Sequence, residues 1–353
     1  MDSFIIIGGG PSAAIEASRL CSLGKDVTII TEQIGGCMEI MGEKRLQSYY
    51  DELYLHDTNL SLVDCMSCVE MTPTANEYVQ YVKRVIDALP VKIIIGKVIW
   101  FTKYKDKFKC LVENQFGKTI YYSQGLVLAT GIISKEIPDT FSLLPHISCF
   151  SAYKLFNQNS HNINKYNQVV ILGGGNTAFQ LANIAASYKL NTTILAKKYL
   201  GLFPQETTDR FALRASSQIT IENIWKSHTT KNKIRLSFLI YSSIFSDGEY
   251  LSVKIEKVKN KIHIADISYS ELFSDIDSDN TKTLLISSQS TLFISAIGVS
   301  CTLPPNDLSQ LKLNSYGYIS NELGRTSIVG LYVAGTLAGA KSVNTMNKVE
   351  YES

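Results

Sequence analysis

The stretch that decides the fold is Phe4-Ile5-Ile6-Ile7-Gly8-Gly9-Gly10-Pro11-Ser12-Ala13. Its apolar run predicts a buried β-strand, and the alanine-rich residues after the glycines predict a helix. A Gly-x-Gly-x-x-Ala turn between a strand and a helix is typical of a dinucleotide-binding βα unit. Gly8 permits the tight turn, Gly10 leaves room for a pyrophosphate, and Ala13 lets the helix pack closely on the strand.

A carboxylate stands where such a unit needs one. Glu32 lies 24 positions after Gly8, at the end of a second predicted strand, Val27–Thr31. At this place a carboxylate accepts hydrogen bonds from the ribose of an adenosine. The alternative is a plain glycine-rich connection between a strand and a helix, which explains the glycines but not the carboxylate.

The same pattern occurs a second time. Gly173-Gly174-Gly175-Asn176-Thr177-Ala178 begins 165 positions after Gly8, within Val169–Ala186, and a second β-branched run follows at Thr192–Leu195. Two such repeats predict an α/β fold with two Rossmann-like dinucleotide-binding domains. Between them we expect a helix at 76–89 and strands at 92–95, 108–113 and 125–130.

The charge that follows the second turn is inverted. Lys197 lies 24 positions after Gly173, and Lys198 comes next. Ammonium groups attract a ribose 2′-phosphate, which a carboxylate would repel, so the second turn suits NADPH and the first suits an unphosphorylated ribose. The two lysines also fit a solvated strand end. Opposite charges predict two different dinucleotides, most simply a resident flavin and a nicotinamide that exchanges.

Composition limits the class of protein. The chain has 353 residues, of which 45% are hydrophobic and 19% charged, and a net charge of +2, which is typical of a two-domain globular protein. We expect no nucleic-acid partner and no membrane partner, because the charge is balanced and the apolar start Phe4–Ile7 is too short for a signal peptide or a membrane span. The seven scattered cysteines indicate reduced thiols in a cytoplasmic protein.

The chain resembles the two-dinucleotide-binding-domain flavoproteins of the pyridine nucleotide-disulfide oxidoreductase superfamily, and among them the low-molecular-weight thioredoxin reductases. The resemblance covers nearly the whole chain. It rests on the order and spacing of these motifs: Gly8–Ala13, Glu32, Gly35–Gly36, Leu128–Gly131, Gly173–Ala178, Ala296–Gly298 and Thr326–Gly335.

This resemblance implies two cofactors, FAD and NADPH, and a division into domains. The FAD-binding domain would be discontinuous (1–160 and 291–353), with the NAD(P)H-binding domain (161–290) inserted in it. Pro138, Pro145 and the Asn-rich run that ends at Asn167 fit a crossing between domains. The cofactor-binding residues that we predict are Gly8, Gly10, Pro11, Ser12, Ala13, Glu32, Gly36, Cys37, Val98, Ala129, Thr130, Gly131, Gly335, Thr336, Gly173, Gly175, Asn176, Thr177, Ala178, Lys197, Lys198 and Gly298.

The chain departs from the family at three places. Thioredoxin reductases carry a Cys-x-x-Cys pair shortly before the second glycine turn, where this chain has only Cys149. In the glutathione reductase branch a cysteine pair follows the Gly-Gly, whereas here Cys37 has Gly42 in the partner position. The aspartate that binds the flavin ribityl chain is Thr336, whose hydroxyl would bond without charge assistance.

The C-terminal motif is also similar to that of the reductases that act on bacillithiol disulfide. Leu331–Gly339 carries this similarity. Those reductases lack the dithiol as well, but their glycine turn has a cysteine where this chain has Ser12.

Cys37 is the candidate catalytic residue. The glycines before it are expected to begin a segment near the flavin, and a thiolate at a helix N-terminus is activated, although an inert packed cysteine fits as well. Cys65 and Cys68 have redox-pair spacing but match no dithiol of the family. No metal is expected, because no second cysteine or histidine pair stands at ligand spacing. His146 is similar to the histidine of a flavin monooxygenase motif, but the glycine of that motif is missing here, so a polar linker is the preferred interpretation.

Three functions are consistent with these patterns. The preferred one is an FAD-dependent NADPH oxidoreductase that passes electrons directly to a small-molecule or protein acceptor, as ferredoxin–NADP reductases of this fold do. The others are a flavin-dependent monooxygenase that oxygenates a small molecule, and a non-catalytic dinucleotide-binding protein. The resemblance also implies a homodimer.

Overall fold

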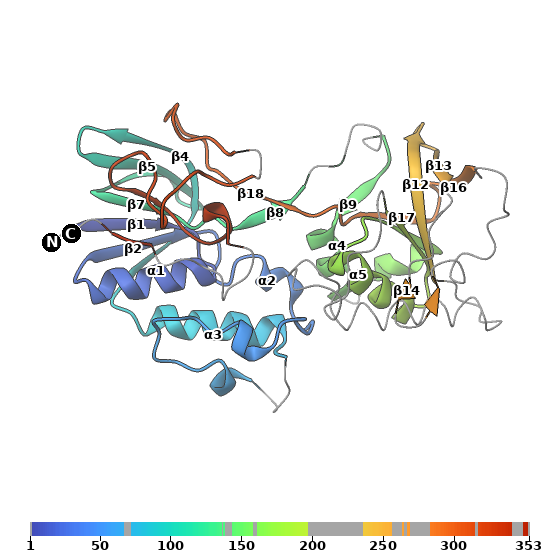
Figure 1. Ribbon diagram of the computed structural model, residues 1–353, viewed down its shortest axis with the longest axis horizontal. Coiled ribbons are helices and arrows are strands. Elements are labelled where there is room, and N and C mark those ends of the chain that lie inside the picture. Colours follow the sequence, from blue (N-terminus) through green and yellow to red (C-terminus); the bar gives the residue numbers. More distant parts are fainter. Residues whose placement is uncertain are drawn as a thin grey trace. The chain divides into compact units, whose positions relative to one another are not determined.

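The computed structural model describes residues 2–66, 72–135, 137, 143–157, 161–196, 236–255, 263–264, 267–268, 283–314, 317–340 and 349–351. The chain forms two compact units, and Figure 1 shows their elements. The first unit is Met1–Ile133 with Ser300–Ser353, and the second is Ser134–Val299. The second unit is therefore inserted in a discontinuous first unit. Within the described part of the chain, no helix has the length and hydropathy that a membrane crossing requires.

The first unit is built on a five-stranded parallel sheet with the order β19-β7-β1-β2-β3. Its strands are short apolar runs, and those at its centre are buried on both faces, as parallel sheets require. The chain runs from β1 to β2 and β3 and then returns to β7 on the other side of β1. Open α/β sheets bind their ligands where the strand order reverses in this way. The strands are β1 (Ser3–Ile7), β2 (Asp26–Thr31), β3 (Lys92–Ile95), β7 (Gly125–Leu128) and β19 (Leu331–Val333).

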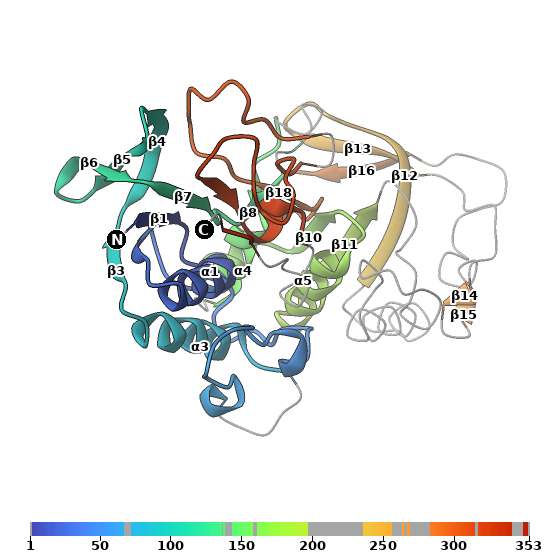
Figure 2. The same ribbon diagram turned by 60° about the vertical axis from the view of Figure 1, so that its left-hand side comes forward.

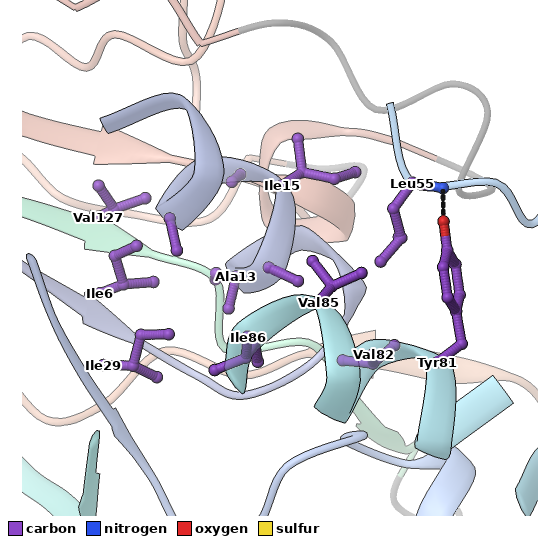
Figure 3. Packing of buried hydrophobic residues seen from close by; sticks show 14 of the residues in the cluster. Ile6, Ala13, Ile15, Ile29, Leu55, Tyr81, Val82, Val85, Ile86 and Val127 are labelled. Carbon is purple, nitrogen blue, oxygen red and sulfur yellow. Dashed lines mark hydrogen bonds between the residues drawn. The ribbon is translucent and has the colours of Figure 1, made fainter. Parts of the chain in front are cut away.

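Two helices, α1 (Pro11–Ser22) and α3 (Ala75–Asp87), cover one face of this sheet. Figure 3 shows apolar side chains of the helices and the sheet in one buried cluster. The hydroxyl of Tyr81 in α3 accepts a hydrogen bond from the N–H of Leu55 at 3.2 Å and donates one to the carbonyl of Leu60 at 3.1 Å. These bonds hold the irregular segment that precedes α3 against the helix.

The predicted helix at 76–89 is α3, which starts one residue earlier and ends two residues earlier. Its start is a capping box. The Thr74 hydroxyl accepts from the N–H of Glu77 at 3.1 Å, and the Glu77 carboxylate accepts from the N–H of Thr74 at 2.7 Å. It ends before Pro90, because the residue that precedes a proline disfavours the helical conformation.

An antiparallel sheet of three strands covers the other face. These strands are β4 (Lys97–Tyr104), β5 (Lys107–Asn114) and β6 (Gly117–Ser123). Phe101 and Phe108 are fully buried between this sheet and the parallel sheet, in a cluster with residues of β1, β7 and β19. Figure 2 shows that α1 and α3 lie on the opposite side of the parallel sheet, so the first unit has three layers.

The second unit repeats the plan with a seven-stranded sheet of order β16-β13-β12-β11-β10-β17-β9. The five strands from β12 to β9 are parallel, and β13 and β16 are antiparallel. Helices α4 and α5 pack against each other. The bounds are β9 (His146–Ser148), β10 (Gln168–Leu172), β11 (Asn191–Ala196), β12 (Leu236–Ser246), β13 (Tyr250–Ile255), β16 (Thr283–Ser287), β17 (Thr291–Ser295), α4 (Cys149–Asn157) and α5 (Asn176–Ser187).

The other elements are short. They are α2 (Met38–Met41), η1 (Tyr50–Glu52), η2 (Val63–Cys65), η4 (His161–Lys165), η5 (Gly335–Ala338), β8 (Ile132–Ser134), β14 (His263–Ile264), β15 (Ile267–Ser268) and β18 (Val299–Cys301). In β8 the chain passes to the second unit and in β18 it returns, and these two strands pair with each other.

The boundaries of the units differ from the predicted ones. The divisions lie at 133/134 and 299/300, whereas 160/161 and 290/291 were expected. The segment interpreted as a linker contains β9 and α4, and the His146 end of β9 lies opposite Phe293 of β17 in the second sheet. A polar, proline-containing composition does not reveal a short strand whose partner is so distant in sequence.

A buried carboxylate ties the end of the chain to α1. The Glu16 side chain is 2% exposed, accepts a hydrogen bond from the Tyr351 hydroxyl at 2.6 Å and pairs with Arg19 at 3.2 Å. The Tyr351 ring packs against Phe4 and Tyr332, with ring centroids 5.6 and 4.8 Å apart. Burial raises the pKa of Glu16, and the Tyr351 hydrogen bond and the Arg19 charge offset part of that rise.

We predict that Glu16→Gln removes a pH dependence of stability. Because the pKa of Glu16 is raised on folding, its contribution is fully present below the unfolded pKa and is lost as the pH rises through the folded pKa. The free energy of unfolding of the wild type, relative to the variant, should therefore fall as the pH rises from 4.5, the ordinary value for a glutamate. Urea unfolding over a series of pH values measures this difference.

The matched control for this prediction is Glu113→Gln, since the Glu113 side chain is 49% exposed. The control should show a much smaller pH-dependent difference. A difference for Glu16→Gln that stays constant with pH would contradict the interpretation.

Candidate functional site

Gly8 ends β1 in a conformation and at a distance that only glycine tolerates. Its φ is +126°. Its N–H donates to the carbonyl of Ile30 at 2.9 Å, and the N–H of Ala129 donates to the carbonyl of Ile7 at 2.9 Å. A Cβ on Gly8 would lie 2.1 Å from the carbonyl oxygen of Ala129. The first turn is therefore held between the ends of β2 and β7 with no space for a side chain.

The second turn is held by the same contacts. Gly173 has φ of +122°, and its N–H donates to the carbonyl of Leu195 at 2.8 Å. The N–H of Ala296 donates to the carbonyl of Leu172 at 2.7 Å, and a Cβ on Gly173 would lie 2.1 Å from the carbonyl oxygen of Ala296. The repeat in the sequence is thus also a repeat of hydrogen bonds.

The third glycine of each turn leaves open space, whereas the first glycine allows close backbone packing. Gly10 and Gly175 are the N-caps of α1 and α5, with ordinary φ values of −88° and −92°, and a Cβ on either would meet nothing within 4 Å. Neither helix has a side-chain hydrogen bond at its N-cap. Open space beside the uncapped N–H groups and positive dipole of a helix N-terminus is an anion-binding arrangement. The residues fit a pyrophosphate in both units.

The first turns of these helices contain the other predicted motif residues. Pro11 is at the start of α1, where its missing N–H costs no helical hydrogen bond. Ala13 and Ala178 are buried against their sheets, whereas Asn176 and Thr177 are half-buried. The two alanines therefore serve packing, and the polar residues remain accessible.

The segment after β2 reaches the first turn. The N–H of Gly35 donates to the carbonyl of Gly9 at 2.8 Å, and a Cβ on Gly36 would lie 3.6 Å from the Cα of Gly10. Glu32 is exposed directly after β2. The structure thus brings Gly36 to the open space at Gly10, and Glu32 follows the strand next to β1.

Cys37 follows this segment at the start of α2. It is partly exposed. The predicted activation by a helix dipole has little basis, because α2 has four residues and few aligned peptide dipoles. Cys37 interacts electrostatically with Tyr78, which is fully buried and whose pKa is raised well above its usual value by that burial. The Tyr78 hydroxyl has no hydrogen-bond partner among the described residues.

The C-terminal segment also reaches the first turn. Gly335 has φ of +65°, and a Cβ there would lie 2.1 Å from the hydroxyl oxygen of Ser12. Thr336 is half-buried in η5, and its carbonyl accepts a hydrogen bond from the Cys301 thiol at 3.3 Å. Burial raises the pKa of Cys301. Two motifs more than 300 residues apart thus contact each other through Ser12 and Gly335.

Thr130 and Gly131 follow β7. The Thr130 hydroxyl donates to the carbonyl of Thr302, and the Thr302 hydroxyl donates to the carbonyl of Thr130 at 2.9 Å. Gly131 has φ of +73° and open space where a Cβ would be. Thr302 and Cys301 belong to no motif, so no sequence pattern indicates that they lie beside the predicted residues.

The remaining predicted positions are less informative. Val98 is buried in the core beneath the antiparallel sheet, so its side chain serves packing and only its backbone could contact a nucleotide. Gly298 lies in the second unit, with φ of +103°, and its carbonyl accepts from the N–H of Lys135 at 3.1 Å. Lys197 and Lys198 lie outside the described residues.

Among the described residues, no two cysteines form a disulfide. Cys149 is buried at the start of α4, 3.3 Å from the Ser134 hydroxyl. Burial raises the pKa of Cys65, and Cys68 lies outside the described residues. No group of three metal-binding side chains occurs in the part of the chain that the structure describes. His146 is the first residue of β9, and its Nδ1 lies 2.8 Å from the carbonyl oxygen of Leu144.

We predict that Gly8→Ala affects mainly the stability of the fold, whereas Gly10→Ala affects mainly the binding of FAD. Gly8→Ala should destabilise the fold by about 3 kcal/mol, because its Cβ meets backbone and its φ is unfavourable. Gly10→Ala should change stability by less than about 1 kcal/mol, yet lose bound FAD, because its Cβ fills the open space at the helix N-terminus. Thermal unfolding and the visible spectrum of the purified variants measure both effects. Normal FAD content in a folded Gly10→Ala variant would show that the dinucleotide lies elsewhere.

Comparisons with known proteins agree with this geometry. A family model described as pyridine nucleotide-disulphide oxidoreductase matches residues 5–350. The solved bacillithiol disulfide reductase Bdr (YpdA) from Bacillus cereus is 15% identical with a TM-score of 0.66, over 98% of this chain and 93% of that chain. The Lactococcus lactis thioredoxin reductase is 15% identical with a TM-score of 0.60, over 98% and 94%.

A hydroxylating enzyme shares the fold as well. The Kutzneria sp. 744 ornithine N-hydroxylase is 11% identical with a TM-score of 0.68, over 98% of this chain and 95% of that chain. No curated protein matches the chain. Since the identities are low, the solved structures establish the fold and the family model establishes the membership. These comparisons confirm the predicted Rossmann-like fold and the superfamily resemblance. They also confirm the assignment as an oxidoreductase that uses FAD and a nicotinamide dinucleotide. Its paired glycine turns, its inserted second unit and the match along nearly its whole length show that the chain belongs to the pyridine nucleotide-disulphide oxidoreductase family.

Proposed function

We propose that the protein is an FAD-dependent NADPH oxidoreductase in which the first unit holds FAD and the second holds NADPH. When bound, the flavin accepts hydride equivalents from the nicotinamide and delivers electrons to an acceptor. The observation that carries the proposal is the repeated turn, with Gly10 and Gly175 each open to solvent at the N-terminus of a helix.

The first turn is assigned to FAD because, among the described residues, two further segments of the chain converge on it. Gly36 lies beside Gly10, and Ser12 contacts Gly335. A resident cofactor with a long ribityl and ring system needs such additional walls, whereas a nicotinamide dinucleotide that exchanges needs fewer. Glu32 would accept hydrogen bonds from the adenosine ribose.

The second turn is assigned to NADPH on the basis of charge. Its β11 ends at Ala196, and the next residues are Lys197 and Lys198. Their ammonium groups would bind the 2′-phosphate that distinguishes NADPH from NADH. Gly173 and Gly175 would place the turn against the pyrophosphate.

The acceptor is proposed to be a small molecule or a redox protein that takes electrons directly. Two solved relatives are named as reductases of bacillithiol disulfide and thioredoxin, which supports a disulfide as one class of acceptor. Cys37 is the proposed thiol for such chemistry, since it follows the segment at the first turn and is partly exposed. A cytoplasmic location and a homodimer belong to the same proposal, and sedimentation velocity tests the latter.

A second candidate function is flavin-dependent oxygenation of a small amine. The observation in its favour is the fold similarity to an ornithine N-hydroxylase, whose structure is described with reduced FAD, NADP+ and L-ornithine. A long-lived hydroperoxide spectrum after mixing the reduced protein with oxygen would favour this candidate. A non-catalytic dinucleotide-binding protein is the third, and a colourless protein that FAD cannot reconstitute would favour it.

We predict that NADPH bleaches the flavin band of the purified protein anaerobically, and faster than NADH does. Lys197→Ala/Lys198→Ala should slow reduction by NADPH and leave reduction by NADH nearly unchanged, because two charge-assisted contacts of about 1.5 kcal/mol each correspond to a loss of about a hundredfold. Stopped-flow absorbance measures both rates.

A control for the lysine variant is Lys154→Ala/Lys165→Ala, which removes the same charge from α4 and η4 of the same unit. It should keep the wild-type preference. Equal rates with NADPH and NADH in the wild type would refute the charge assignment, and a yellow protein that neither nucleotide reduces would refute the electron path.

A further inference from the structure

The antiparallel sheet of the first unit has an outward face that is unusually apolar. Its inward residues, such as Phe108, are buried against the parallel sheet, so the residues of opposite parity point away from it. Across the three strands, Trp100 of β4 lies opposite Leu111 of β5, which lies opposite Ile120 of β6. Tyr122 occupies the next outward position on β6. Antiparallel sheets with one covered face usually alternate to polar residues on the other.

The apolar side chains of β6 on this face are exposed, whereas Trp100 and Leu111 are half-buried. Ile120 is 44% exposed and Tyr122 is 54% exposed, and the ends of the sheet add Tyr104 at 60% and Phe116 at 88%. Figure 2 shows β5 and β6 projecting beyond the parallel sheet on this side of the first unit. The apolar row across the three strands is therefore a surface of the unit that is most exposed at β6, and this exposure is unfavourable unless something covers it.

The same sheet carries a net positive charge. Residues 97–123 contain six lysines, no arginine, one aspartate and one glutamate, a net charge of +4. The whole chain carries +2, so the other residues together carry −2. On the outward face, Lys109 lies between Thr102 and Tyr122, and its ammonium is 5.8 Å from the centre of the Trp100 ring. The lysines are thus interleaved with the aromatic rings.

The chemistry of the face selects among possible partners. A second copy would bring +4 against +4, which is repulsive. Protein interfaces are enriched in arginine and depleted in lysine, whereas all the basic residues of this sheet are lysines. Lysines with tyrosine, tryptophan and an exposed aliphatic residue are instead the set that lies at the surface of an anionic bilayer.

We propose that the outward face of β4–β6 docks the first unit onto an anionic phospholipid surface. Lys107 and Lys109 meet the phosphates, while Ile120 and Tyr122 enter the interfacial layer; Lys118 is paired with Glu113 at 3.5 Å on the same face. The sequence alone predicts no membrane partner, because the total charge and the lack of a long apolar segment hide a face formed by three strands. The proposal does not depend on which reaction the nucleotide sites perform, and lipid binding is measured without turnover.

Sedimentation of the full chain with vesicles tests the proposal. The wild type should bind vesicles of phosphatidylcholine that contain about 30 mole percent phosphatidylglycerol, less so as salt rises, and should not bind phosphatidylcholine alone. Lys107→Glu/Lys109→Glu should weaken binding about thirtyfold or more. Ile120→Thr/Tyr122→Thr should weaken it about tenfold, since threonine keeps the strand preference and removes the apolar contact.

Controls separate this surface from general charge. Lys154→Glu/Lys312→Glu makes the same change of charge at two exposed lysines outside the sheet and should bind like the wild type. Circular dichroism and thermal unfolding establish that each variant is folded. Wild type that stays in solution with anionic vesicles, or a control that loses as much affinity as Lys107→Glu/Lys109→Glu, would overturn the proposal.

Two further results would assign the face to another partner and thereby overturn the membrane proposal. One is binding to poly-L-glutamate that depends on Ile120 and Tyr122 when vesicles are not bound. The other is a dimer in sedimentation velocity that Ile120→Thr/Tyr122→Thr dissociates.

Discussion

The approach of a glycine to a backbone carbonyl underlies both halves of the protein. Gly8 and Gly173 each lie where a Cβ would be 2.1 Å from a carbonyl oxygen, of Ala129 and Ala296 respectively. The contact brings the end of the strand that precedes each turn, β1 or β10, to the end of its neighbour, at the point where the strand order reverses. The helix that follows can then begin with its N–H groups directed at open space.

In the first unit, two segments distant in sequence lie beside the glycine turn. Gly36 comes from the segment after β2 and Gly335 from the end of the chain, and both lie against the glycine turn or the start of α1. The end of the chain is itself held by Tyr351 on the buried Glu16 of the same helix. One helix therefore joins the nucleotide turn, the C-terminal segment and the core. This shared support explains how a discontinuous domain can build one site.

The departures from the family concern the acceptor more than the cofactors. The glycines that shape the two turns are intact, whereas the dithiol is missing and the carboxylate expected after Gly335 is Thr336. Cys37 and Cys301 lie on segments that reach the first turn or its surroundings. A chain that keeps the two dinucleotide-binding turns and lacks the family's dithiol is suited to a different electron acceptor.

The sequence by itself determined the elements that depend on local patterns. The two βαβ repeats, the helix at Ala75–Asp87 and the α/β class followed from apolar runs, glycines and a capping box. It did not determine the unit boundaries, the contact of Ser12 with Gly335 or the apolar row on β4–β6, because each depends on strands or segments far apart in the chain. Local propensity acts within a few residues, whereas pairing and packing decide which distant residues share a surface.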